Sequence, residues 1–194
     1  MKRKIVAVLL FLSWSVALAE DQMQIGFRGL PWGASEGQVR ARYGKEMKRE
    51  KCGTTLARAK AYIHQACDNP VIDPYEVAGI PFKLSFELSK ETRALVEVSL
   101  YFSMKVEPHS ESPAVVDWRA KNDLLHASLI KRFGDFGTHN VLEKDGLFLL
   151  NESWHTSDTK IELQSVLHNE YADDVREDFQ LTYKPLSGDV ESRL

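Results

Sequence analysis

Apolar and polar side chains alternate along two neighbouring stretches, residues 82–88 and 96–102. Alternation with a period of two is typical of a β-strand that buries one face. The short polar segment at 89–93 predicts that the two strands pair as an antiparallel hairpin with one apolar face. That face needs a cover, and a helix that precedes it along the chain is the nearest candidate.

Two helices are predicted from their ends and their apolar spacing. Ser35 followed by Gln38 is a capping-box pattern, in which each side chain satisfies a backbone N–H of the other residue, and Gly44 suits the end of that helix. A second and longer helix is predicted over 112–133, where a serine and a proline mark the start. Its apolar stripe comprises Val115, Trp118, Leu125, Leu129 and Phe133.

Four further strands are predicted at 140–144, 147–154, 159–166 and 179–183, and the proline-containing stretch 68–75 is predicted to be a loop. Each half of the chain is therefore a helix followed by antiparallel strands. The predicted fold class is α+β, with two tandem units that each pack a helix on an antiparallel β-sheet. The predicted boundaries are a signal peptide at 1–19, a first αβ unit at 20–106, a second αβ unit at 107–186 and a flexible tail at 187–194.

The first nineteen residues have the features of an export signal. A basic start at Lys2, Arg3 and Lys4 precedes an apolar core, and Ala17-Leu18-Ala19 supplies a small-x-small cleavage site. We expect cleavage after Ala19 and a periplasmic location, with an uncleaved N-terminal anchor as the alternative. No cysteine lies near the cleavage site, so no lipid anchor is expected, and after cleavage no membrane span is expected.

The net charge argues against nucleic acid as a partner, and the cysteines predict a disulfide. Cleavage of the signal peptide removes three basic residues, which leaves 22 of the 25 basic residues against 28 acidic ones, so nucleic acid is not an expected partner. The only two cysteines, Cys52 and Cys67, are most simply one structural disulfide in an oxidising compartment. A redox pair would favour the Cys-x-x-Cys spacing, which is absent, and a metal site would need more ligands nearby.

The run Gly33-Ala34-Ser35-x-x-Gln38-Val39, closed by Gly44, resembles a motif of two related groups of proteins. One is the SmpA/OmlA type of outer-membrane assembly lipoprotein, and the other is the secreted beta-lactamase inhibitor proteins, which consist of two tandem units. The strands at 82–102 and the Cys52/Cys67 pair are similar to features of those units. The resemblance implies a tandem αβ fold and a habit of binding proteins through sheet surfaces and loops. It carries over no functional residue.

Catalysis is the less favoured interpretation. Ser35 lies in a Gly-x-Ser-x-Gly pattern, which occurs at the nucleophile of α/β-hydrolases, but those enzymes alternate strands and helices whereas this chain predicts antiparallel hairpins. Ser35 also has a structural role as a helix cap. The six histidines show no zinc-binding spacing, so no metal and no cofactor is expected.

The favoured hypothesis is an exported, non-catalytic binding or protein-interaction protein, whose partner is another periplasmic or envelope protein. The predicted partner surface is the sheet face away from the helices, which carries Lys83, Ser85, Glu87, Glu97, Ser99 and Tyr101. The alternatives are a small periplasmic serine hydrolase that uses Ser35, and a carrier of an apolar ligand between sheet and helix.

Overall fold

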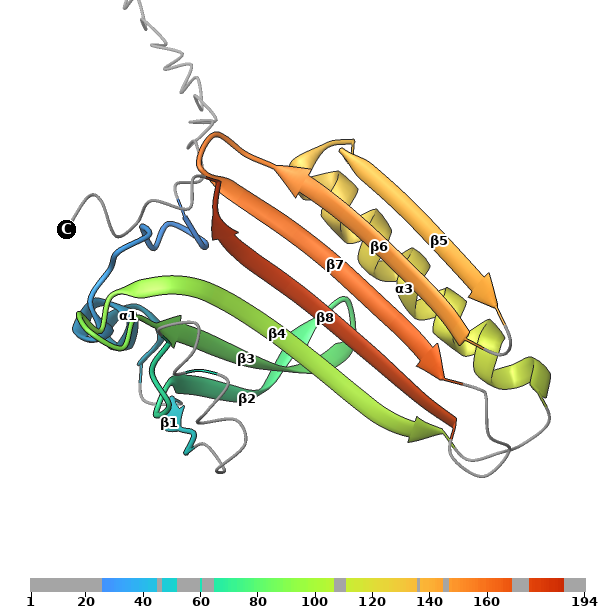
Figure 1. The fold of residues 1–194 in the computed structure, drawn as a ribbon, viewed down its shortest axis with the longest axis horizontal. Helices are drawn as coiled ribbons and strands as arrows, with labels where there is room; N and C mark the ends of the chain where they lie inside the picture. Colours follow the sequence, from blue (N-terminus) through green and yellow to red (C-terminus); the bar gives the residue numbers. More distant parts are fainter. Residues whose placement is uncertain are drawn as a thin grey trace, which may run out of the picture.

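The computed structural model describes residues 26–44, 47–51, 60, 65–106, 111–135, 137–144, 147–168 and 175–186. Within them, antiparallel strands form one eight-stranded sheet in the order β1-β2-β3-β4-β8-β7-β6-β5 (Figure 1). In chain order the elements are α1 (Glu36–Tyr43), β1 (Lys48–Arg49), β2 (Pro70–Val77), β3 (Ile80–Leu88), β4 (Leu95–Val106), α3 (Glu111–Phe133), β5 (Thr138–Lys144), β6 (Leu147–His155), β7 (Thr159–His168) and β8 (Val175–Pro185).

The prediction of two tandem units, each with its own sheet, is wrong. β4 belongs to the first predicted unit and β8 to the second, and they pair with each other along nine residues, from Val98 opposite Tyr183 to Val106 opposite Val175. Leu100 and Leu181, which lie opposite each other in this pairing, are almost fully buried. The two halves therefore share one sheet and one core, because the last strand of the first half, β4, pairs with the last strand of the second half, β8.

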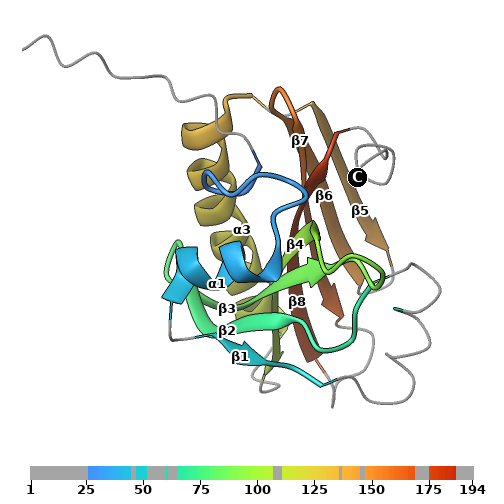
Figure 2. The same cartoon turned by 90° about the vertical axis from the view of Figure 1, so that its left-hand side faces the viewer.

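The helices α1 and α3 lie on the same face of this sheet (Figure 2). α3 buries Trp118, Leu125 and Leu129 against the strands of the second half. Its Asn122 Oδ1 accepts a hydrogen bond of 2.5 Å from the buried Ser165 hydroxyl on β7. α1 is short and contributes the fully buried Val39 to the same core. One face of the sheet is thus apolar and covered, and the other is polar.

Several local predictions are confirmed. α1 begins after Ser35, which forms the capping box with Gln38, and Gly44 ends it with a positive φ of 76°. α3 runs over almost the predicted residues. β3 and β4 form the predicted antiparallel hairpin, in which Leu84 lies opposite Leu100 and Phe86 opposite Val98.

The loop predicted at 68–75 is wrong, because most of it belongs to β2. Pro70 is the first residue of the strand, where the missing N–H disturbs the ladder least. The pairing with β3 is irregular between Ile72 and Tyr75, and Pro74 lies within that irregularity. The two prolines therefore occupy positions that a strand tolerates, which composition alone does not reveal.

The segment before α1 ties the two halves together. Phe27 and Leu30 are buried in the common core. The Trp32 Nε1 donates to the Thr159 hydroxyl on β7 at 3.0 Å, and the Gly26 N–H donates to Asp158 at 2.8 Å. Gly26 has a φ of 69°, and a Cβ there would lie 2.1 Å from the Leu30 carbonyl oxygen, so this position requires glycine.

Some predictions fall outside the residues that the structure describes. These are the signal peptide at 1–19 and the tail at 187–194. Within the described part of the chain, neither helix combines the length and the apolar character that crossing a bilayer requires.

Candidate functional site

The polar face of the sheet is organised in rows that run across the strands. Strand register places Tyr101, Gln180, Gln164, Asn151 and Asn140 side by side, one from each of β4, β8, β7, β6 and β5. The adjacent row on this face consists of Ser99, Thr182, Glu162, Ser153 and Thr138. Because alternate residues of a strand face the same side, nine of these ten side chains present an amide or a hydroxyl group on one surface.

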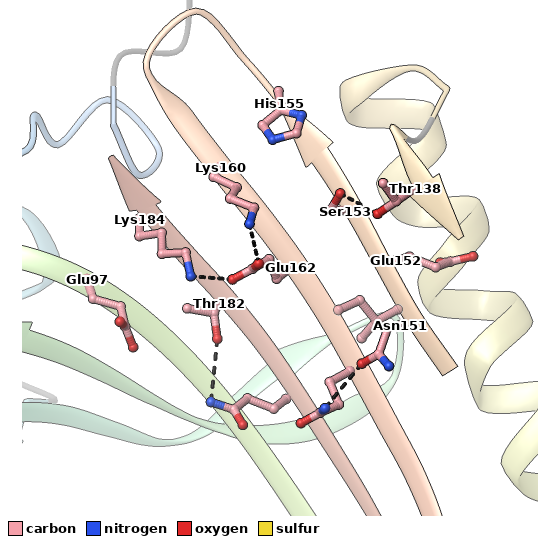
Figure 3. A pocket seen from close by; sticks show the side chains of 13 residues that line it. Glu97, Thr138, Asn151, Glu152, Ser153, His155, Lys160, Glu162, Thr182 and Lys184 are labelled. Carbon is pink, nitrogen blue, oxygen red and sulfur yellow. Dashed lines mark hydrogen bonds and ion pairs between the residues drawn. The ribbon is translucent and has the colours of Figure 1, made fainter. Parts of the chain in front are cut away.

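A concavity of about 590 Å³ lies over these rows (Figure 3). Its lining includes Asn151, Gln164, Gln180, Thr182, Ser153 and Thr138. Gln164 Nε2 donates to Asn151 Oδ1 at 3.1 Å, and the hydroxyls of Thr138 and Ser153 lie 2.7 Å apart. Each amide and hydroxyl can both donate and accept hydrogen bonds, so the surface suits a ligand with many polar, uncharged groups.

The charges at one end of the concavity neutralise one another in part. Glu162 accepts hydrogen bonds from Lys160 at 2.6 Å and from Lys184 at 2.5 Å. Burial alone would raise the pKa of Glu162, but hydrogen bonds from Lys160 and Lys184 hold that pKa below its ordinary value. The carboxylate is therefore ionised at neutral pH and shared between two cations.

Glu97 extends the concavity towards the first half of the sheet. Burial raises its pKa, and the nearby like charge of Glu87 raises it further. The charged form of Glu97 is therefore less favoured than the charged form of an exposed glutamate. This shift agrees with a low net charge on this surface.

The six residues of the predicted partner surface share this polar face, but they do not form one exposed patch. Register pairs Lys83 with Tyr101, Ser85 with Ser99 and Glu87 with Glu97 on the strands β3 and β4. Tyr101 is exposed, and its hydroxyl donates to Asp178 at 3.0 Å. Of the six, only Glu97 lines the concavity.

Ser85 and Glu87 are covered by the chain that precedes β2. Lys60 and the Asn69 amide both contact the Glu87 carboxylate, and the Ser85 hydroxyl donates to it at 2.7 Å. Both residues are less than 9% exposed, and Lys83 forms an ion pair with Glu50. A partner therefore cannot reach Ser85 or Glu87 without displacing these contacts.

Ser35 has the surroundings of a helix cap. Its Oγ lies 3.1 Å from Gln38 Oε1 and accepts from the Gln38 N–H at 3.4 Å. Among the described residues, no histidine or carboxylate is hydrogen-bonded to this hydroxyl. Cys67 is disulfide-bonded, but Cys52 lies outside the described residues, so their pairing stays a prediction.

A second cluster lies on the covered face and was not predicted. The buried Glu152 of β6 accepts from His126 of α3 at 2.9 Å and faces His139 of β5 at 2.8 Å. Figure 3 shows the Glu152 side chain lying beside α3, and Glu152 is also one of the residues that line the concavity. The alternation of the strand at 147–154 places Glu152 on the same side as Trp154, and that was the available signal.

A groove of about 300 Å³ opens at this edge between α3 and β5, and Trp118, Val141 and Leu150 line it. The core beneath the helix is filled by side chains such as Leu125, Ile161 and Leu163, each at most 1% exposed. This packing leaves little space for a ligand and argues against the hypothesis that the protein carries an apolar ligand between sheet and helix. The described residues also hold no group of three or more His, Cys, Asp or Glu arranged to hold a metal ion.

Comparison with models of protein families, with curated proteins and with solved structures finds no match to this chain. The resemblance to the lipoprotein and inhibitor groups therefore depends on the sequence motif alone.

Proposed function

We propose that this chain is an exported, non-catalytic binding protein whose ligand is an uncharged oligosaccharide, bound on the open polar face of β6, β7 and β8. The observation that supports this proposal is the concavity of about 590 Å³, with its rows of amide and hydroxyl side chains. Vicinal hydroxyls of a sugar both donate and accept hydrogen bonds, and this lining offers both in return.

Charge argues for an uncharged ligand. Lys160, Glu162 and Lys184 already satisfy one another, and Glu97 has a raised pKa. A strongly anionic or cationic ligand would have to disrupt the shared Glu162 carboxylate. A neutral ligand needs only the hydrogen bonds that the amide row can exchange for water.

The lining favours a sugar over a protein surface. Protein interfaces depend on a few buried anchors, most often Trp, Tyr or Arg. The concavity is lined by none of these residue types. A partner protein would therefore find hydrogen-bonding groups at this surface without the pocket that usually holds an anchor.

The test is a binding isotherm with neutral oligosaccharides, using chitooligosaccharides and β-glucan oligosaccharides as probes on an array and then in calorimetry. The double variant Gln164→Ala/Gln180→Ala removes the centre of the amide row, and both side chains are exposed, so the fold should persist. We expect a loss of affinity of at least about tenfold, since an unmatched hydrogen bond costs roughly 1–2 kcal/mol.

The matched control is Asn140→Ala, which removes an amide of the same row on β5, outside the concavity lining. It should bind as the unaltered chain does. Absence of binding to every neutral probe, or equal binding by the double variant, would overturn the proposal. Intact mass after recovery from the periplasmic fraction tests export and cleavage after Ala19 separately.

A further inference from the structure

β5 forms one edge of the sheet and is fully exposed. It is the outermost strand, and all seven of its residues, Thr138–Lys144, are exposed to solvent. Its inner side pairs with β6 in continuous register, without a bulge. No described strand pairs with its outer side. An edge of this length presents backbone N–H and C=O groups that can pair with a further strand.

The edge is apolar at its centre on both faces. Val141 is 61% exposed and Leu142 is 46% exposed. Because consecutive residues point to opposite faces, one lies on the helix side and the other on the polar side. Proteins usually protect such edges with a central charge, a proline or a bulge, and the centre of β5 has none of these.

We propose that β5 pairs with β5 of a second copy of this chain, antiparallel, about a two-fold axis at Val141. In this register the strand places one complementary pair, repeated by the axis, on either side of Val141, and Asn140 lies opposite Leu142. His139 of one copy lies opposite Glu143 of the other, and Thr138 lies opposite Lys144. Val141 meets Val141 on the helix side, beside the groove that Trp118 and Leu150 line.

The charges near the edge extend this complementarity. Within one chain Glu143 lies 3.5 Å from Arg119 of α3, and His139 is held by Glu152. Pairing aligns the Arg119–Glu143 pair of one copy with the His139–Glu152 pair of the other, and the two-fold axis repeats the contact. A strand of unrelated sequence would not reproduce this match twice, which is why a second copy is the favoured occupant.

The arrangement joins two sheets edge to edge. An axis perpendicular to the sheet keeps both polar faces on one side and both copies of α3 on the other. The two concavities would then open onto one continuous surface. The dimer does not depend on what binds there, so it stands or falls independently of the proposed ligand.

The first test is sedimentation velocity of the purified chain over about a hundredfold range of concentration, because self-association depends on concentration. We expect a monomer–dimer equilibrium for the unaltered chain and a monomer throughout for Val141→Lys. Val116→Lys is the matched control, since Val116 is an equally exposed apolar residue at 63% on α3, and it should dimerise normally. A monomeric unaltered chain, or equal dimerisation of Val141→Lys, would overturn the proposal.

Cysteine cross-linking tests the register without relying on a disruptive variant. Directly opposed residues of an antiparallel pair have Cα atoms about 4.5–5.5 Å apart, within reach of a disulfide. Val141→Cys should therefore give a covalent dimer on a non-reducing gel under mild oxidation. Leu142→Cys lies across from Asn140 and should not. Cross-linking of both variants to the same extent, or of neither, would contradict the two-fold axis at Val141.

Discussion

The junction between β4 and β8 decides whether the two halves of this chain unfold together. Leu100 and Leu181 lie directly opposite each other in that junction and are each 1% exposed. Replacing either leucine by alanine removes buried methyl groups and leaves a cavity, which costs about 2–5 kcal/mol. We therefore expect Leu100→Ala to lower the free energy of unfolding of the whole domain by about 3 kcal/mol.

The assay is urea unfolding, monitored by tryptophan fluorescence and by hydrogen exchange of peptides from β3 and β7. With a slope near 2 kcal/mol/M, a loss of about 3 kcal/mol lowers the midpoint by about 1.5 M. Because one sheet spans both halves, peptides from β7 should lose protection against hydrogen exchange to the same extent as peptides from β3. This should occur although Leu100 belongs to the first half. The variant Leu181→Ala should give the same result from the opposite side.

Leu124→Ala is the control, since Leu124 is 56% exposed on α3 and its truncation should change stability by less than about 0.5 kcal/mol. The loss of stability in the double variant Leu100→Ala/Leu181→Ala should differ from the sum of the two single losses, because the residues are direct cross-strand neighbours in the core. Two separate transitions, with β7 unchanged by Leu100→Ala, would refute a single cooperative sheet.

Three further predictions follow from local contacts. Ser35→Ala should lower the free energy of unfolding in urea by about 1 kcal/mol through loss of the helix cap, and an unchanged midpoint would contradict that role. Burial opposes ionisation of Glu36 and Asp68, but hydrogen bonds from Arg93 lower the pKa of each, so their contribution to Tm is present at neutral pH and lost as pH falls through the lowered values. Thermal melts should therefore show that the Tm of the unaltered chain falls below pH 4.5, and that the Tm of Glu36→Gln falls by less over the same range. Equal falls in Tm for the two proteins would argue against this network. Glu152→Ala removes the shared acceptor of two histidines and should cost about 2–3 kcal/mol, with faster hydrogen exchange in α3 as the check.

The elements that the sequence predicted correctly are those whose evidence is local. The capping box at Ser35 and Gln38 needs only neighbouring residues, and the alternation at 82–88 needs only one strand with a buried face. The β4–β8 junction carries no such local signal. Val98 and Tyr183 are distant in sequence, and nothing in either strand states which partner will cover its free edge. Sheet order was therefore the part that sequence patterns could not supply.

The predicted partner surface also shows what strand alternation can and cannot predict. Alternation correctly placed Ser85, Glu87 and Glu97 on the polar side of the sheet, because the side of a strand follows from its period. It could not show that Lys60 and Asn69 would cover Glu87. A polar residue on the outer side of a strand is exposed only when no other segment of the chain lies above it.

This covering divides the polar face into a covered part over β3 and a part over β6, β7 and β8 that holds the concavity. Over β3, the buried polar groups of Ser85, Glu87 and Asn69 satisfy one another, so their hydrogen bonds hold the chain before β2 in place. On β7 and β8 the amide side chains of Gln164 and Gln180 are exposed to solvent, whereas the hydroxyl-bearing Ser153 and Thr182 beside them are buried. Open amide groups contribute little to stability, because water satisfies them as well as protein does. The proposed binding function depends on their gathering in one concavity, which lies on strands of the second half and not on β3.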